Sequence, residues 1–394
     1  MRFDAIGFLV ELGRRWIDPE NPFRREALEQ VPVSAGFGVE SFACGLDRTF
    51  SLLSREGLSR MLDGVGRERP SDPVADSSLL LIPGGRVPDP TVRSVVRAVL
   101  AGYSQISIKP PSLETRFASI FVRSWEAVGS EWGAVPCRLR TETWDRTDTD
   151  RIKKVLGTAG TTILYGSDET VDIVGSLLPS GSRFLPHGHK VSLALLCQEC
   201  QGSNRLKSWA EGLARDVAVY DQGGCLSPIA LYYEQGEERG GGALGELLAE
   251  TFESVHSQWP AGRLGALETA PVVRTLRSRI ESGRGGRLWT PGRSSVWTVA
   301  LDPNLDLEPV PAARFLPLRR VGSLEEVAGR LGDHGGKIQG VALCPGPHSS
   351  RIEEIARGLE PSLIRPAGRL QDPPPDWCED GQKDLSSLFK WQGN

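Results

Sequence analysis

Residues 77–110 read SSLLLIPGGRVPDPTVRSVVRAVLAGYSQISIKP, and this stretch decides the fold class. The apolar run 77–85 ends in Gly-Gly and suits a buried strand. A helical pattern over 91–102 follows and ends at Gly102, and a second short strand is predicted over 105–110. Because a strand, a helix and another strand make a βαβ unit, the stretch predicts a parallel sheet.

The same alternation continues through the first half of the chain. A helix is predicted over 116–129, a strand over 161–166, a helix over 167–178, and a turn followed by a strand over 184–196. The chain is therefore expected to be α/β, with a doubly wound parallel sheet. Such sheets usually place their ligands at the carboxyl ends of the strands.

The expected domain organisation follows from these patterns. Residues 1–75 are predicted to be mostly helical, including a helix over 51–61, and to pack on a doubly wound domain of residues 76–206. A second α/β domain is expected over 207–365, and a Pro-rich extended segment over 366–394.

Composition narrows the class of protein. The 394 residues are 39% apolar and 24% charged, which is typical of a globular protein with a sizeable core. The formal net charge of −4 argues against nucleic-acid binding. No apolar run approaches the ~18 residues of a transmembrane helix, and no signal peptide is expected. Seven scattered cysteines, an odd number, favour reduced thiols and a cytoplasmic location.

Cys225 is the first candidate for chemistry, within the segment DQGGCLSP (221–228). The two glycines before it let the backbone turn sharply and let a substrate approach closely. A thiolate here would be a good nucleophile if backbone N–H groups lower its pKa. The alternative is a buried structural cysteine, which is the commonest fate of a free thiol.

Two predicted strand ends carry further candidates. Lys109 ends the strand 105–110, where it would reach a ribose or a phosphate, or else simply be solvated. Ser167 fits the N-cap of the helix 167–178. The alternative is a pyrophosphate at that helix N-terminus, although Asp168 and Glu169 would oppose an anion there.

Several common motifs are absent or incomplete. The G-x-G-x-x-G at 240–245 lies in a Gly-rich stretch (238–246) that is interpreted as flexible surface and not as a dinucleotide-binding turn, and the chain has neither G-x-x-x-x-G-K-[ST] nor G-x-S-x-G. Cys197 and Cys200 form a C-x-x-C, which is interpreted as two ordinary thiols because no second pair accompanies it. His187 and His189 are interpreted as polar turn residues, and no metal site is expected.

The order of these pieces resembles the aldehyde dehydrogenase superfamily, in which the separation of Lys190 and Cys225 is typical. More closely, the chain resembles the acyl-CoA reductase family, whose best-known member makes the long-chain aldehyde of bacterial bioluminescence. The resemblance is carried by IPGGRVPDP (82–90), LAGY (100–103), IKPPS (108–112), YGSDETV (165–171), HGHKVSLAL (187–195), DQGGCLSP (221–228) and GRLQDPPPDWCEDGQKDLSSLFKW (368–391).

The resemblance implies an aldehyde dehydrogenase-like fold, in which a cofactor-binding domain, here 76–206, and a catalytic domain, here 207–365, flank a cleft. It implies that Cys225 attacks the thioester carbonyl and expels coenzyme A. The acyl-enzyme would then accept hydride from NADPH and release an aldehyde. The backbone N–H of Cys225 would stabilise the oxyanion.

The resemblance also implies a cofactor site. Lys109 would hold the adenosine ribose. Ser112 stands where NAD-preferring relatives often carry Glu, and a neutral side chain there favours NADP because it does not repel the 2′-phosphate. The remaining contacts that the resemblance implies are Gly166, Ser167, Gly188 and Glu308.

Two departures from the superfamily pattern bear on activity. Pro186 replaces the Glu that activates deacylating water in oxidising aldehyde dehydrogenases, which favours reduction of a thioester. Arg86 replaces the Asn whose side chain completes the oxyanion hole. Arg86 is either a substitute donor, the sign of another substrate such as an acyl phosphate, or the sign of lost activity, since one oxyanion donor is typically worth ~10²–10³ in rate.

The sequence therefore predicts an NADPH-dependent acyl-CoA reductase that forms an aldehyde. The alternatives are an acyl-phosphate or acyl-protein reductase, and a catalytically weak homologue that binds acyl chains or serves as a scaffold. The expected partners are an acyl-CoA or acyl-carrier donor, an acyl-transferring enzyme, and a second copy of the chain.

Overall fold

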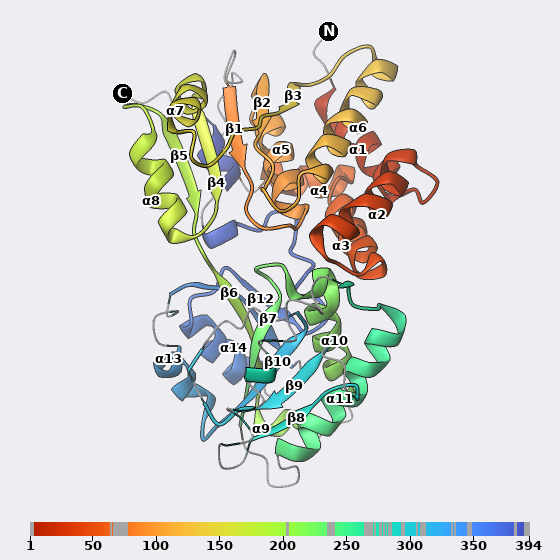
Figure 1. Ribbon diagram of the computed structural model, residues 1–394, viewed down its shortest axis with the longest axis vertical. Coiled ribbons are helices and arrows are strands. Elements are labelled where there is room, and N and C mark those ends of the chain that lie inside the picture. The colour runs from red at the N-terminus through yellow and green to blue at the C-terminus, as the bar shows by residue number, and fades with distance from the viewer. Residues whose placement is uncertain are drawn as a thin grey trace. The chain divides into compact units, whose positions relative to one another are not determined.

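The computed structural model divides into two compact units (Figure 1). Unit 1 comprises Met1–Ala35, Leu46–His189 and Pro374–Asn394, and unit 2 comprises Gly36–Gly45 and Lys190–Pro373. The sequence-based division placed the main boundary at residue 206. The structure describes residues 4–63, 65, 78–201, 205–234, 241–263, 271, 273–275, 278, 280, 282, 286–292, 296–304, 306–307, 313–331, 334, 336–344, 349–381 and 384–389.

Unit 1 is built on a five-stranded sheet in which every neighbouring pair is parallel. Its spatial order is β3-β2-β1-β4-β5. The chain thus leaves β1 toward one edge and returns to β4 on the other side, which makes a switch point between these two strands. This order confirms the predicted doubly wound parallel sheet. The strands are β1 (Ser78–Ile82), β2 (Gln105–Ile108), β3 (Arg138–Thr141), β4 (Thr161–Tyr165) and β5 (Arg183–His187).

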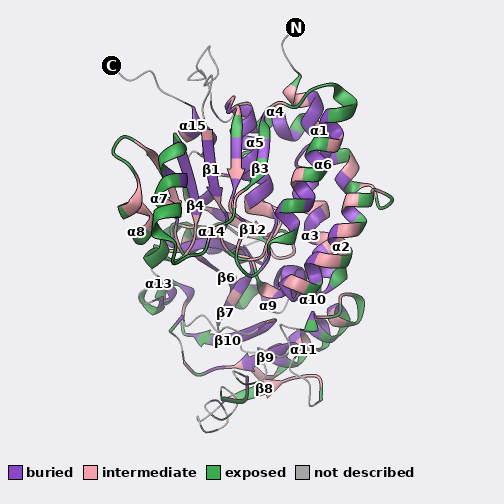
Figure 2. Ribbon diagram, turned by 45° about the horizontal axis from the view of Figure 1, so that its top comes forward, coloured by how far each residue is buried: buried purple, intermediate pink, exposed green. Residues whose placement is uncertain are grey.

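Helices between the strands bury β1 on both faces, which explains its continuous apolar run (Figure 2). Leu80 and Leu81 are both at most 1% exposed, and Leu80 packs with Val155 and Leu156. The helices are α5 (Asp89–Leu100), α6 (Arg116–Trp132), α7 (Thr149–Thr158) and α8 (Asp168–Leu177).

The N-terminal part is helical as predicted, with α1 (Ala5–Ile17), α2 (Pro22–Ala35), α3 (Val39–Ser51) and α4 (Arg55–Asp63). The predicted helix 51–61 is wrong at its start, because a turn separates α3 from α4. The Ser54 hydroxyl accepts a hydrogen bond from Gly57 N at 3.0 Å, so this residue begins a new helix instead of continuing the old one.

Aromatic packing joins α1 to α6 within unit 1. The Trp16 ring stacks on Phe50 with ring centroids 4.6 Å apart, and its indole N–H donates to the Ser124 hydroxyl of α6 at 3.0 Å. Trp16 is fully buried, and the hydrogen bond to Ser124 offsets the loss of water from its indole N–H.

Unit 2 holds a seven-stranded sheet in the order β12-β11-β6-β7-β10-β9-β8. All neighbours are parallel except β8 and β9, which are antiparallel. A second α/β sheet was expected, and it is present. Its strands are β6 (Val191–Leu196), β7 (Pro228–Glu234), β8 (Arg287–Trp289), β9 (Thr298–Leu301), β10 (Phe315–Val321), β11 (Ile338–Leu343) and β12 (Leu363–Pro366).

The stretch 184–196, predicted as a turn and one strand, contains parts of two strands in different sheets. β5 ends at His187 in the first sheet, and β6 begins at Val191 in the second. Only β6 is buried at every position, which is why only VSLALL stood out as an apolar strand in the sequence.

Helices complete unit 2, among them α11 (Gly241–Gln258) and α13 (Val327–Arg330). From Pro374 onward, the tail that was expected to be extended lies in unit 1 and is interrupted by the turn η5 (Glu379–Gly381) and by α15 (Asp384–Leu388). None of the helices in the described part of the chain is both long and apolar enough to cross a membrane. The elements of unit 2 used below are α9 (Gln198–Gln201), α10 (Leu206–Ala218), η2 (Val219–Gln222), η3 (Leu324–Glu326), and α14 (Ser349–Gly358).

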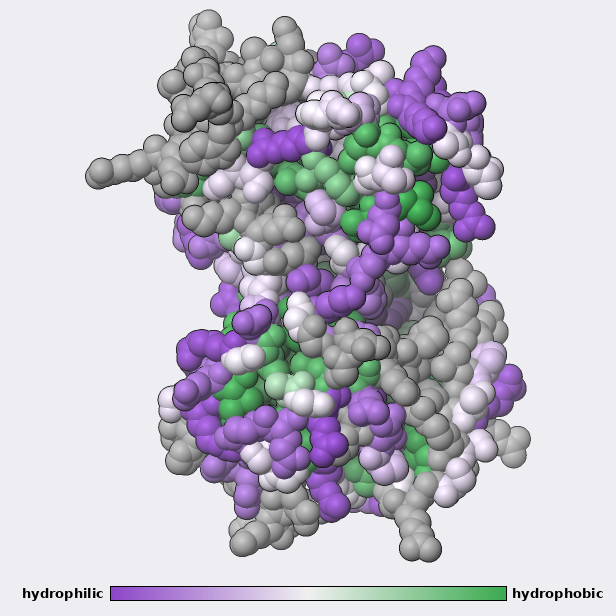
Figure 3. All heavy atoms as spheres, turned by 90° about the vertical axis from the view of Figure 1, so that its left-hand side faces the viewer, coloured by the Kyte–Doolittle hydropathy of each residue, from purple (hydrophilic) through white to green (hydrophobic). Residues whose placement is uncertain are grey.

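One helix of unit 1 keeps much of its apolar surface open. α8 has no fully buried residue, and Ile173 is 54% exposed. Figure 3 shows hydrophobic surface on the side of the molecule that carries α7 and α8 in Figure 1. Exposed apolar surface of this kind is common at sites of protein association.

Candidate active site

The loop that carries Cys225 has an unusual backbone. It follows α10 and η2, and Tyr220, Asp221 and Gln222 have φ angles of 54°, 47° and 65°. Each non-Gly residue in this left-handed region costs about 1–3 kcal/mol and persists only where its surroundings fix it. Cys225 itself is exposed, three residues before β7 begins.

The buried Asp221 carboxylate fixes this loop. One oxygen pairs with Arg314 Nε at 2.6 Å, and the other accepts from Gly38 N at 2.6 Å and from Gly262 N at 3.1 Å. Burial lowers the pKa of the Arg314 guanidinium, and the neighbouring Asp221 opposes that shift. The pair therefore joins three distant segments of unit 2 to the loop.

The Gln222 side chain makes a second set of links. Its amide nitrogen donates to the carbonyls of Pro228 and Phe315, both at 2.8 Å, and its oxygen accepts from Phe315 N at 2.7 Å. Pro228 begins β7 and Phe315 begins β10. The loop is thus anchored to the amino ends of two neighbouring strands.

Contacts on either side of the thiol hold Cys225 in place. The Ser192 hydroxyl donates to the Cys225 carbonyl at 2.7 Å, and Gln371 Nε2 donates to the Ser227 hydroxyl at 2.6 Å. A Cβ on Gly223 would lie 2.9 Å from the Tyr220 carbonyl oxygen and 3.0 Å from the Phe37 ring, so a side chain there would shift the loop. The alternative of a buried structural cysteine is wrong, since an exposed residue on a fixed backbone suits a nucleophile.

On unit 1, Lys109 follows β2 as predicted. Its backbone N donates to the Leu81 carbonyl at 2.8 Å, and its ammonium lies 5.9 Å from the centre of the Trp144 ring. Burial lowers the pKa of Lys109. Ser112 lies further along the same loop and is exposed.

The structure brings Gly166, Ser167 and Gly188 together at the ends of β4 and β5. Gly166 N donates to the His187 carbonyl at 3.1 Å, and the Ser167 hydroxyl accepts from Thr170 N at 3.2 Å, which confirms the predicted N-cap. A Cβ on Gly188 would lie 2.8 Å from an Asp168 carboxylate oxygen. A side chain at this position would displace the exposed Asp168 carboxylate, which accepts from His189 N at 3.2 Å.

Arg86 follows β1 at the switch point. Its Nη1 donates to the Ala35 carbonyl at 2.8 Å. Two residues earlier, a Cβ on Gly84 would lie 2.7 Å from the Tyr165 carbonyl, so the ends of β1 and β4 approach closely. Glu308 lies outside the described residues.

A buried network that the sequence did not suggest lies beside these residues. Glu379 accepts from Arg97 Nη1 at 2.9 Å and from the Tyr165 hydroxyl at 2.6 Å, and the Tyr165 ring stacks on His187 at 4.3 Å. His187 is therefore a buried residue of β5, not the polar turn residue that was expected. Burial alone would raise the pKa of Glu379, but Arg97, His187 and Tyr165 together hold it below its usual value.

This network ties the C-terminal tail to the candidate cofactor residues. Tyr165 directly precedes Gly166 and Ser167, and His187 directly precedes Gly188. The only sequence feature that pointed to this network was the Trp and the acidic residues of the tail segment WCEDG (377–381). Their partners are distant in the chain. Within the described residues, no group of three or more His, Cys, Asp or Glu side chains is arranged to hold a metal ion.

The fold and the thiol define the class. The structure is similar to succinic semialdehyde dehydrogenase from Streptococcus pyogenes in complex with NADP+, with a TM-score of 0.67 and 13% identity over 93% of this chain and 82% of that chain. The chain therefore has the aldehyde dehydrogenase-like fold that was predicted.

The particular family follows from the sequence. Residues 78–391 match the family described as acyl-CoA reductase (LuxC), and the chain belongs to it. This confirms the predicted family. Long-chain acyl-protein thioester reductase 2 of Photobacterium leiognathi is 23% identical over 78% of this chain and 62% of its own length. Long-chain acyl-protein thioester reductase of Aliivibrio fischeri is 22% identical over 90% of this chain and 74% of its own.

The buried ion pair yields a stability prediction. Asp221→Ala should destabilise the protein by about 3–5 kcal/mol, because it leaves the Arg314 charge buried without its carboxylate. Urea unfolding measures the loss. The control is Glu353→Ala, which removes an exposed pair with Arg357 and should cost at most about 1 kcal/mol. Equal losses in the two variants would show that the Asp221 pair is not an anchor.

The Glu379 network yields a pH prediction. A carboxyl whose pKa is lowered by folding stabilises the native state above its unfolded pKa of about 4.3, and this contribution is lost as pH falls through the lower folded value. The stability difference between wild type and Glu379→Gln should therefore be largest near pH 7 and shrink below about pH 4. Urea midpoints at pH 7, 5, 4 and 3 give this difference, and a difference that grows in acid contradicts the assignment.

Proposed function

We propose that this chain reduces an acyl thioester to an aldehyde with NADPH, through an acyl-enzyme on Cys225. The observation that carries the proposal is the exposed thiol on a loop fixed by Asp221 and Gln222. Membership of the acyl-CoA reductase family supports the reaction class.

The proposed chemistry has two halves. The Cys225 thiolate attacks the thioester carbonyl, its sulfur bonds to the acyl carbon, and the donor thiolate leaves and takes up a proton. NADPH, when bound, supplies the hydride that becomes the aldehyde C–H. The bond from the acyl carbon to the Cys225 sulfur then breaks, and its electron pair returns to the sulfur.

Charge develops on the acyl oxygen in both halves. We assign its stabilisation to the backbone N–H of Cys225 and to the Arg86 guanidinium. Nη1 of Arg86 donates to the Ala35 carbonyl at 2.8 Å, and a guanidinium carries only donors, which suits it to a developing negative charge. Pro186 supports reduction over hydrolysis, since it offers no carboxylate to activate water.

The residues of unit 1 fit a dinucleotide. Gly84 and Tyr165 approach closely at the ends of β1 and β4, on the two sides of the switch point where such ligands bind. Lys109 is proposed to hold the adenosine ribose, beside the neutral and exposed Ser112. Gly166, Ser167, Gly188 and Glu308 are the remaining proposed contacts.

Two classes of acyl donor remain in the proposal. The matched relatives are named acyl-protein thioester reductases, which favours an acyl-protein donor handed over by an acyl-transferring enzyme. An acyl-CoA is the alternative, and the two share the thioester that Cys225 attacks. A homo-oligomer is also proposed, and the exposed apolar surface of α8 supports it. A cytoplasmic location is proposed as well, because an odd number of cysteines favours reduced thiols.

Acylation of Cys225 is the first test. Incubation with a panel of acyl-CoAs, without NADPH, should add one acyl mass to the intact wild-type protein and none to Cys225→Ala, because only the thiolate forms the acyl-enzyme. Intact-protein mass spectrometry measures the shift. If no acyl-CoA labels the wild type, the acyl donor of the proposed reaction is an acyl-protein or an acyl phosphate instead of an acyl-CoA. A label that persists without turnover on NADPH indicates the scaffold role.

Cofactor choice gives a second test. Ser112→Glu should raise KM for NADPH at least about tenfold and leave KM for NADH nearly unchanged, because the carboxylate repels the 2′-phosphate. Initial rates with the two cofactors measure the ratio. Ser112→Gln, which adds similar bulk without charge, is the matched control, and an equal effect in both variants would contradict a 2′-phosphate contact.

A further inference from the structure

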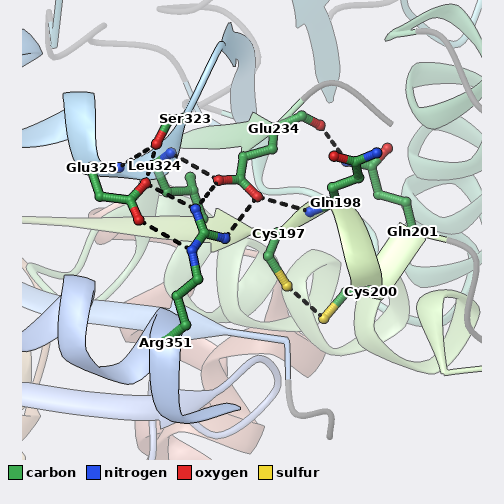
Figure 4. A network of polar contacts seen from close by, with 9 residues as sticks. All are labelled: Cys197, Gln198, Cys200, Gln201, Glu234, Ser323, Leu324, Glu325 and Arg351. Atoms are coloured by element: carbon green, nitrogen blue, oxygen red, sulfur yellow. Dashed lines mark hydrogen bonds and ion pairs between the residues drawn. The ribbon is translucent and has the colours of Figure 1, made fainter. Parts of the chain in front are cut away.

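A pair of buried thiols lies at the carboxyl end of the sheet in unit 2. β6 ends at Leu196, and Cys197 and Cys200 follow around the first turn of α9. Their sulfur atoms are 3.0 Å apart and point toward each other (Figure 4). This is roughly 1 Å more than the disulfide bond length of about 2.05 Å. The residues are only 2% and 5% exposed.

The backbone between the two thiols already has a geometry that a disulfide accepts. Cys200 N donates to the Cys197 carbonyl at 3.3 Å, which closes a turn. The two Cα atoms of such a turn lie within about 7 Å, and disulfides span about 4.4–6.8 Å between Cα atoms. Little backbone movement separates the dithiol from the bridged form.

Glu234, at the end of β7, holds this turn from both sides. Its carboxylate accepts from Gln198 N at 3.1 Å, and its backbone carbonyl accepts from the Gln201 side chain. Arg351 of α14 binds the same carboxylate through two nitrogens, at 2.6 and 3.1 Å (Figure 4). The sulfur atoms are therefore held together by groups outside the C-x-x-C itself.

We propose that Cys197 and Cys200 are a redox site, at which a hydroperoxide converts the two thiols to a reversible intramolecular disulfide. The Cys200 sulfur attacks one peroxide oxygen, the O–O bond breaks, and a sulfenic acid and water or an alcohol result. The Cys197 sulfur then attacks the Cys200 sulfur and expels water. Two thiols lose two electrons in total, and the peroxide gains two.

The contact between the sulfur atoms decides which thiol reacts first. The Cys197 S–H points at Cys200 and lowers the pKa of Cys200, whereas Cys344 and burial raise it, to about 12 overall. The pKa of Cys197 is raised further, first by the contact with Cys200 and then by burial. Cys200 is thus the first of the two to become a thiolate, and oxidation should accelerate as pH rises.

Peptide mapping of the peroxide-treated full chain tests the proposal. Trypsin releases residues 191–205 as one peptide with both cysteines. After hydrogen peroxide, this peptide should be two hydrogens lighter and should resist alkylation until it is reduced. Cys137, which is equally buried, is the internal control and should stay reduced. A peptide alkylated at both thiols, oxidation of Cys137 to the same extent, or a disulfide between Cys200 and Cys344 would overturn the proposal.

A variant distinguishes disulfide formation at a preorganised pair from oxidation that follows general unfolding. Glu234→Gln weakens the anchor of the turn without touching a thiol, and should slow disulfide formation by about three- to tenfold, the range expected for one hydrogen bond or ion contact. Glu353→Gln, on the exposed side of α14, should leave the rate unchanged. Equal rates for wild type and Glu234→Gln would contradict a preorganised pair. Neither measurement depends on the acyl-reductase activity.

Discussion

The contact between Asp221 and Arg314 is the constraint on which the Cys225 loop of unit 2 depends. Three successive residues in left-handed conformations are unfavourable by themselves, so the Cys225 loop persists only while its surroundings hold it. A buried carboxylate is also unfavourable unless it is paired and hydrogen-bonded. Asp221 meets that condition with one guanidinium and two backbone N–H groups. These contacts offset the strain of the loop and the burial of the carboxylate only when all the segments are assembled.

A buried carboxylate that pairs with an arginine occurs at two further places in the chain. Glu379 binds Arg97 and Tyr165 beside the proposed cofactor residues, and Glu234 binds Arg351 and two backbone N–H groups beside the thiol pair. In each case one buried carboxylate joins segments that are remote in sequence. Charge-assisted hydrogen bonds are shorter and stronger than neutral ones, which suits them to fixing loops that have no regular structure.

Much of the fold could be predicted from the sequence, because buried parallel strands produce continuous apolar runs. The runs around β1 and β4 identified the first sheet, whereas the run around β6 was assigned to the first domain and belongs to the second sheet. β3 was missed because it is an edge strand, RLRT, with only Leu139 buried, and α7 was missed with it. The Ser167 cap could be predicted because capping is local. The partners of Asp221, Glu379 and Cys197 could not, because nothing in the spacing of residues 221 and 314 or of 97 and 379 indicates that they meet.

The dependence of the Cys225 loop on Arg314 has a consequence for biosynthesis. Domains generally fold as their segments emerge from the ribosome, at about 5–20 residues per second, so Arg314 arrives roughly five to twenty seconds after Cys225. During that interval the Cys225 loop lacks the contact between Asp221 and Arg314. The loop can therefore take up its fixed conformation only after residue 314 has been synthesised.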